Sequence, residues 1–100
     1  MILLIAWSVV ANQWPGLTDA QRSWFAKQFN SRGEVCCTDA DGHRIDQWDI
    51  RNGHYRAFFD GRWLDIPDDI VLAGPNPVNS AVLWFNYSNL PRCFIPGPGA

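Results

Sequence analysis

The amino-acid sequence predicts an α+β fold, in which one N-terminal helix packs on a small antiparallel sheet of about five strands and a disulfide stabilises the domain. Three observations predict it: a helix-capping signal before a short apolar stripe, two tight-turn dipeptides between alternating residues, and cysteines far apart in the chain. A chain of 100 residues has room for a single hydrophobic core, so we expect one domain. Strands in this order are compatible with a meander core, as in an SH3-like or other partly open barrel.

The chain begins with its most apolar stretch. From Ile2 to Ala11 there is no charged residue, and at about 1.5 Å per residue a helix of this length is too short to span a bilayer. It has the length of the apolar region of a signal peptide, and Val9 and Ala11 are small residues of the kind that precede a cleavage site. No Lys or Arg precedes the run. We therefore divide the chain into an apolar leader at residues 1–11, either cleaved or retained as an anchor, and a single domain at residues 12–100.

The segment LTDAQRSWFAKQFNSRG predicts one helix of about three turns. Thr18 is a favourable N-cap, and Gln21 three positions later completes a capping box. Phe25 and Phe29 lie four residues apart and therefore share a face that can pack on the sheet. Gly33 stands where a glycine commonly ends a helix.

The segment DQWDIRNGHYRAFFDGRWLDIP predicts a three-stranded meander, because it contains an Asn-Gly and an Asp-Gly dipeptide, both favoured in two-residue hairpin turns. With such turns, Arg51 faces His54 across the first hairpin and Phe59 faces Arg62 across the second. Side chains alternate between the two faces of a sheet. One face of the meander then collects the residues of a predicted core: Trp48, Ile50, Tyr55, Ala57, Phe59, Leu64 and Ile66.

The opposite face of the meander is the candidate binding surface, and it collects Asp49, Arg56, Phe58, Trp63 and Asp65. Arg56 stands between the two aspartates, which predicts charge pairing across the strands. Phe58 and Trp63 form a pair of rings on the same face. Rings there are either covered, by the N-terminal helix or another strand, or form a platform for a ligand or a protein partner.

Two further strands are expected after the meander. AVLWFNYS predicts the fourth strand and RCFI the fifth, with a proline-rich loop before them and NLP between them.

The three cysteines predict a disulfide between Cys37 and Cys93, with Cys36 as the alternative partner and the third thiol free or in an intermolecular bond. The bond would close a loop of more than fifty residues, which the chain-entropy model values at about 4 kcal/mol. A bond between the two adjacent cysteines would be strained. A thioredoxin-like motif is excluded, because it needs two residues between its cysteines.

A zinc site is the other use of these cysteines that we considered. The spacing of its potential ligands matches no common zinc pattern, and adjacent cysteines point in different directions along an extended chain. A calcium loop built around Gly42 fails, because Trp48 stands where such a loop requires a carboxylate. We therefore expect no metal and no cofactor, although the potential zinc ligands would be Cys36, Cys37, His43 and Cys93.

Neither catalysis nor nucleic-acid binding is predicted. The sequence has no nucleophile elbow, Walker loop or dinucleotide-binding fingerprint. Its ten acidic and eight basic residues are mixed along the chain, with a net charge of −2 and no basic stretch for nucleic acid. His54 is interpreted as a solvated strand end, and Asp39, Asp41 and Asp46 near His43 would raise the pKa of that imidazole.

Three motifs, EVCCTDADGHRI, GHYRAFFDGRWLDIPDD and PRCFIPG, resemble a group of small, uncharacterised exported bacterial proteins. The pattern of that group comprises an apolar leader, a short helix with Trp-Phe, a Cys-Cys pair, a His-Tyr-Arg … Asp-Gly-x-Trp hairpin and a terminal Arg-Cys-Phe. The similarity covers residues 24–97, and the chain departs from the pattern in a leader without basic residues and a short segment between Val82 and Pro91. The resemblance implies export and the crosslink, and it implies no activity.

Together these observations predict a non-enzymatic domain that is periplasmic or secreted, or associated with the envelope, and that acts by binding a protein partner. Contact with a membrane is expected only through residues 1–11, if they are retained. The alternative is a structural subunit of a membrane complex or virus particle that keeps its apolar N-terminus. A third hypothesis is a thiol or zinc-binding protein.

Overall fold

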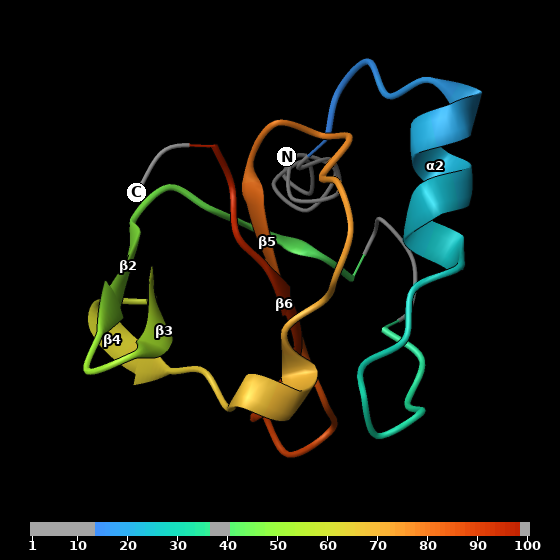
Figure 1. Cartoon of the computed structure of the whole chain (residues 1–100). Helices are drawn as coiled ribbons and strands as arrows, with labels where there is room; N and C mark the ends of the chain where they lie inside the picture. The colour runs from blue at the N-terminus through green and yellow to red at the C-terminus, as the bar shows by residue number, and fades with distance from the viewer. Residues whose placement is uncertain (1–13, 37–40, 99–100) are drawn as a thin grey trace, which may run out of the picture.

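The structure, a computed structural model, describes residues 14–36 and 41–98 (Figure 1). The leader predicted at residues 1–11 lies outside the described residues. The α+β class is confirmed. In chain order the elements are α2 (Asp19–Ala26), β1 (His43–Ile45), β2 (Trp48–Arg51), β3 (His54–Phe59), β4 (Arg62–Asp65), the 3-10 helix η1 (Asp68–Ile70), β5 (Ala81–Phe85) and β6 (Pro91–Ile95).

The strands form two antiparallel sheets instead of the single sheet of about five strands that the sequence predicted. One three-stranded sheet has the order β1–β5–β6, and the other is the meander β2–β3–β4. The prediction was wrong because β1 was not recognised as a strand: its three residues are too few to show an alternating pattern. β1 pairs with β5, with Ile45 opposite Ala81, and the chain then changes sheets across Asp46 and Gln47.

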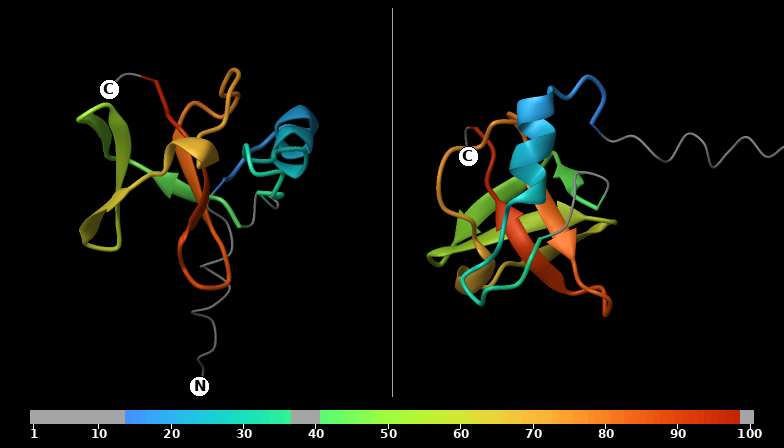
Figure 2. Two further views of the ribbon diagram at one scale, coloured as in Figure 1. Left: turned by 60° about the horizontal axis from the view of Figure 1, so that its bottom comes forward. Right: turned by 90° about the vertical axis from the view of Figure 1, so that its right-hand side faces the viewer.

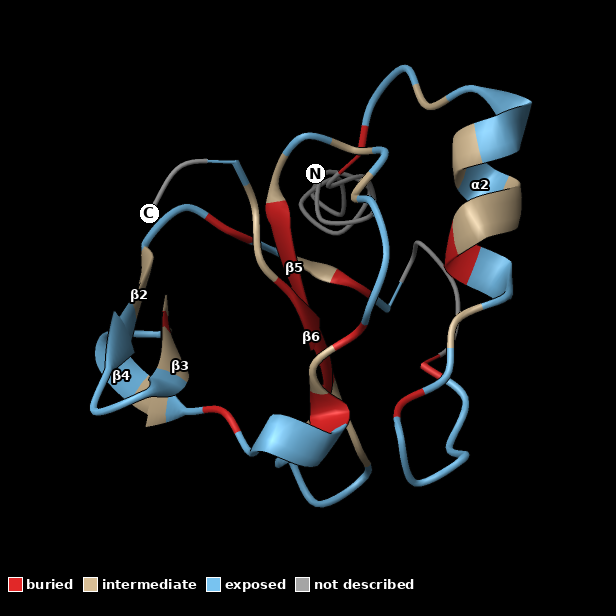
Figure 3. Cartoon of the chain, in the orientation of Figure 1, coloured by how far each residue is buried: buried red, intermediate tan, exposed pale blue. Residues whose placement is uncertain are grey.

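β5 and β6 form the central layer of the molecule and are buried on both faces. Their side chains alternate between one cluster that includes Phe25 of α2 and a second cluster that includes the core face of the meander. Figure 2 shows the helix and the meander on opposite sides of this layer, and Figure 3 shows that burial is concentrated on β5 and β6. Burial on both faces explains why AVLWF is an unbroken apolar run while the meander alternates.

The start of the helix is as predicted. The backbone N–H of Gln21 donates to Thr18 Oγ1 at 3.1 Å, and the backbone N–H of Thr18 donates to Gln21 Oε1 at 2.8 Å, which completes the capping box. Phe25 of this helix is fully buried against Trp14 and Trp84.

The helix ends at Ala26, well before the predicted end at Gly33. The side chain of Asn30 accepts hydrogen bonds from the backbone N–H groups of Arg32 and Glu34, and this local turn replaces helical hydrogen bonds. Phe29 is therefore 61% exposed instead of continuing the apolar face of the helix.

The register predicted for the meander is confirmed at all eight pairs, four in each hairpin. Ala57 and Ile66 are buried, and most of the predicted core face packs against the central layer. Ile50 is the exception, with 55% of its surface exposed. It lies on an edge strand next to the hairpin turn, where the described part of the other sheet does not reach.

The disulfide joins Cys36, the alternative partner, to Cys93, with their Cα atoms 5.7 Å apart. The preferred pairing of Cys37 is thereby corrected. Cys36 is buried in the cluster beneath the helix, where its backbone N–H donates to Gln28 O at 2.9 Å. Cys37 itself lies outside the described residues.

Gly42 precedes β1 and lets it approach the central layer closely. A Cβ atom at this position would lie 2.9 Å from Val82 Cγ1 and 3.2 Å from Phe25 Cε1. The carbonyl oxygen of Gly42 accepts a hydrogen bond from Trp14 Nε1 at 3.0 Å. Trp84 Nε1 would also lie 3.2 Å from that Cβ atom, so the structural role of Gly42 is to leave room for three core side chains.

Candidate functional site

The structure places all five residues of the predicted binding surface on one face of the meander, opposite its core face. We refer to this face, formed by Asp49, Arg56, Phe58, Trp63, Asp65 and the neighbouring Arg51 and His54, as the outer face. Among the described residues, neither α2 nor the β1–β5–β6 sheet packs on it, and η1 touches only its end at His54 (Figure 1). The helix, which we considered as a cover for the rings, lies on the far side of β5 and β6.

Arg56 is the centre of the outer face and is held on two sides. Its Nε and Nη2 atoms donate to the two carboxylate oxygens of Asp49 at 2.9 and 2.6 Å. Its guanidinium carbon lies 4.4 Å from the centroid of the Trp63 ring, within the range of a cation–π interaction. The hydrogen bond with Arg56 lowers the pKa of Asp49 and raises that of Arg56, although partial desolvation opposes both shifts.

Of the two aspartates predicted to pair with Arg56, only Asp49 forms an ion pair with it among the described residues. Among the described residues, the carboxylate of Asp65 makes no ion pair or hydrogen bond, and it acts on Arg56 only as a nearby charge. Asp65 is exposed. The outer face therefore combines a satisfied Asp49–Arg56 pair with a carboxylate that remains available.

The ring pair is uncovered. Phe58 and Trp63 meet edge to face with their centroids 5.4 Å apart, and Trp63 is 39% exposed. The other tryptophans in the described part of the chain are buried or pack against the core clusters. Trp63 is thus the described tryptophan that remains accessible to a partner.

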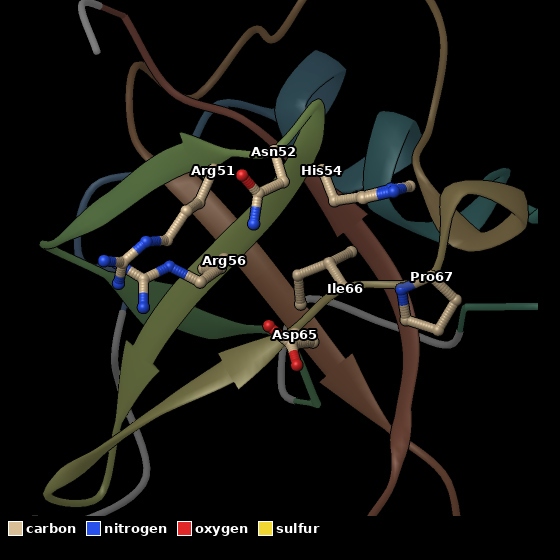
Figure 4. Close-up of a pocket in the computed structure, with 7 residues that line it drawn as sticks. All are labelled: Arg51, Asn52, His54, Arg56, Asp65, Ile66 and Pro67. Carbon is tan, nitrogen blue, oxygen red and sulfur yellow. The ribbon is translucent and has the colours of Figure 1, made fainter.

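A hollow of about 390 Å³ lies at one end of the outer face. In Figure 4 the guanidinium groups of Arg51 and Arg56 extend toward the same side of it, away from His54 and Pro67. Arg56 is held there by its two hydrogen bonds with Asp49, and the nearby charge of Arg51 also lowers the pKa of the Asp49 carboxyl group. The lining residues are Arg51, Asn52, His54, Arg56, Asp65, Ile66 and Pro67.

Sequence reasoning missed Arg51 and His54 as members of this surface. The alternation that placed Asp49 and Arg56 on the outer face also places the next pair toward the turn, Arg51 and His54, on that face. His54 is an exposed strand end as expected, but it is not free: its Nδ1 lies 2.9 Å from Asp68 Oδ1.

The pKa of His43 differs from the one that the sequence predicted. Burial lowers the pKa of its imidazole, and the opposing attraction of Asp41 is the smaller effect, so the predicted rise in pKa was wrong. The imidazole packs against Phe59 and Phe85, with ring centroids 5.0 and 5.4 Å away, and these two rings also contact each other. These three residues line part of a second hollow, of about 460 Å³, at the open end of the two sheets.

Two of the three cysteine sulfurs of the zinc hypothesis are in use. Cys36 and Cys93 are bonded to each other, which leaves neither as a thiolate ligand. Within residues 14–36 and 41–98, no three His, Cys, Asp or Glu side chains gather in a way that could hold a metal ion.

In the described ranges, no helix is both long enough and apolar enough to cross a membrane. Comparison of the chain with protein-family models, with curated proteins and with solved structures gives no match.

Proposed function

We propose that this chain is a non-enzymatic domain, exported or associated with the envelope, that binds a protein partner through the outer face of the meander. The observation that carries the proposal is a sheet face that no described element covers and that presents Trp63 beside Arg56. Trp and Arg are among the residues that contribute most to binding at protein interfaces.

The side chain of Arg56 is also preorganised for binding. Two hydrogen bonds to Asp49 and the contact with Trp63 already restrict the Arg56 side chain, so a partner would lose little free energy in ordering it. The hollow next to Arg56 could accept one side chain of a partner, and Asp65 offers that side chain a carboxylate. A protein surface fits this broad face better than a small molecule, which would leave most of it in water.

The disulfide fits an oxidising compartment, such as the periplasm or the exterior of the cell. Intact-mass analysis of the protein from its native source, with free thiols alkylated, tests the location. A mass that begins at Asn12, with one alkylated thiol, would support a cleaved and exported domain. A mass that begins at Met1 would contradict cleavage and support the alternative of a structural subunit that retains residues 1–11.

Site-specific photo-crosslinking tests the binding surface. A photoreactive phenylalanine analogue at Phe58 should crosslink to one defined partner in the native cell envelope. The same analogue at Tyr87, which is fully exposed in the turn between β5 and β6, is the matched control. Equal crosslinking from both positions would mean that the contacts are non-specific and would contradict the proposal.

Trp63→Ala should abolish capture of that partner, whereas Tyr87→Ala should leave it unchanged. Near-ultraviolet circular dichroism would show whether both variants keep the fold. Retained capture by Trp63→Ala would exclude the outer face as the interface.

A further inference from the structure

The outer edge of β4 is an open strand edge. In the meander order β2–β3–β4, β4 pairs only with β3. The Asp-Gly turn makes Phe59 and Arg62 the first pair, and the N–H of Ile66 donates to Tyr55 O at 2.9 Å. Alternation then directs the backbone groups of Trp63 and Asp65 away from β3. Within the described chain these two residues have no backbone partner on that side.

The spacing of these two residues makes the edge self-complementary. If a second copy of β4 runs antiparallel to the first about a two-fold axis at Leu64, Trp63 of each copy lies opposite Asp65 of the other. Each such pair exchanges two N–H···O bonds, so the outward backbone groups of both residues are satisfied in both copies. The two meanders would then form one continuous sheet, with both outer faces on the same side.

Charge and ring contacts favour the same register. Opposite residues of an antiparallel pair share a face, so Asp65 of one copy would lie beside the exposed Trp63 ring of the other. Arg56 lies 4.4 Å above that ring. The carboxylate that lacks an ion-pair partner within the described chain would thereby approach a guanidinium that has one carboxylate partner.

We propose that the chain self-associates through this edge, as a two-fold dimer in which β4 pairs with β4 of a second copy. The inference does not depend on the protein partner proposed above, because it follows from the outward backbone groups of β4; the side chains of Trp63 and Asp65 belong to both surfaces. A strand of four residues buries a small area, so we expect a weak dimer with a dissociation constant on the order of 100 µM.

Amide hydrogen exchange of the oxidised full chain, measured by NMR at two concentrations, tests the register residue by residue. At about 1 mM only about one fifth of the chains would be monomeric, so the amides of Trp63 and Asp65 should exchange about fourfold more slowly than at about 10 µM. The amide of Ile66, already bonded to Tyr55, should not respond. Exchange of Trp63 and Asp65 that is independent of concentration would overturn the proposal, even if the chain associates through another segment.

A proline at an outward position supplies the matched variants. Asp65→Pro removes an N–H that points away from β3, so it should spare the meander and weaken dimerisation at least about tenfold, because two of four hydrogen bonds are lost. Asp65→Ala keeps the N–H and should weaken dimerisation only about two- to threefold. Sedimentation equilibrium gives both dissociation constants. A dimer of Asp65→Pro as strong as that of the original chain would overturn the proposal.

Discussion

The two sheets of this protein have the same number of strands and the same antiparallel pairing, yet they are covered differently. The β1–β5–β6 sheet has the helix on one face and the meander on the other, and Trp84 at its centre is fully buried. The meander is covered on one face only, and Trp63 on its other face is 39% exposed.

The difference shows how a small domain divides its strands between a fully buried sheet and a sheet covered on one face only. The central sheet contributes the buried area and the disulfide that stabilise the fold. The meander needs only one of its faces for the core, so the other is free to carry charged and aromatic residues. Four predictions test this division, from the largest expected effect to the smallest.

Alanine substitutions of one tryptophan in each sheet compare the two directly. Trp84→Ala should lower the free energy of unfolding by about 5 kcal/mol, because the ring is enclosed by Phe25 and Trp24 and its loss leaves a cavity. Trp63→Ala should lower it by less than about 1 kcal/mol. Urea unfolding followed by circular dichroism gives both values, and equal losses would contradict the division.

Removal of the disulfide should have the next largest effect. Replacing Cys36 and Cys93 together with alanine should lower the free energy of unfolding by about 4 kcal/mol, because the bond joins residues 57 positions apart. Cys37→Ala is the matched control and should unfold close to the original protein. A loss in the Cys37 variant as large as that in the double variant would mean that Cys37, and not Cys36, pairs with Cys93.

Loss of the helix cap should have a smaller effect. Thr18→Ala removes the acceptor for the Gln21 N–H and should lower the free energy of unfolding by about 1 kcal/mol. Thr18→Ser retains a hydroxyl and should recover most of the loss. If serine is as destabilising as alanine, the capping hydrogen bond is not the cause.

The smallest effect is a dependence of stability on pH. Burial lowers the pKa of His43 below its ordinary value of 6.5, so between the two values the unfolded chain binds more protons than the folded one. Stability is therefore complete above about pH 6.5 and decreases as the pH falls below it. His43→Gln should reduce the difference between urea midpoints at about pH 7.5 and pH 5.5. An unchanged difference would assign the pH response to another group.

Much of the candidate site could be predicted because its geometry is local. Two turn dipeptides determine the register, the register determines which side chains share a face, and the outer face follows from alternation alone. What could not be predicted is whether that face is covered. That depends on where the helix packs, and the helix occupies the far side of residues that come more than fifty positions later.

The sequence by itself determined the start of the helix at Thr18 and the register of the meander, because both depend on hydrogen bonds between residues close in the chain. Only the tertiary structure decided that β1 pairs with β5 and not with the adjacent meander, and that Cys36 is the cysteine that faces Cys93. It also decided that Gly42 leaves space for core side chains and that burial lowers the pKa of His43. Each of these outcomes depends on packing between segments that are distant in sequence, where local propensity carries no information.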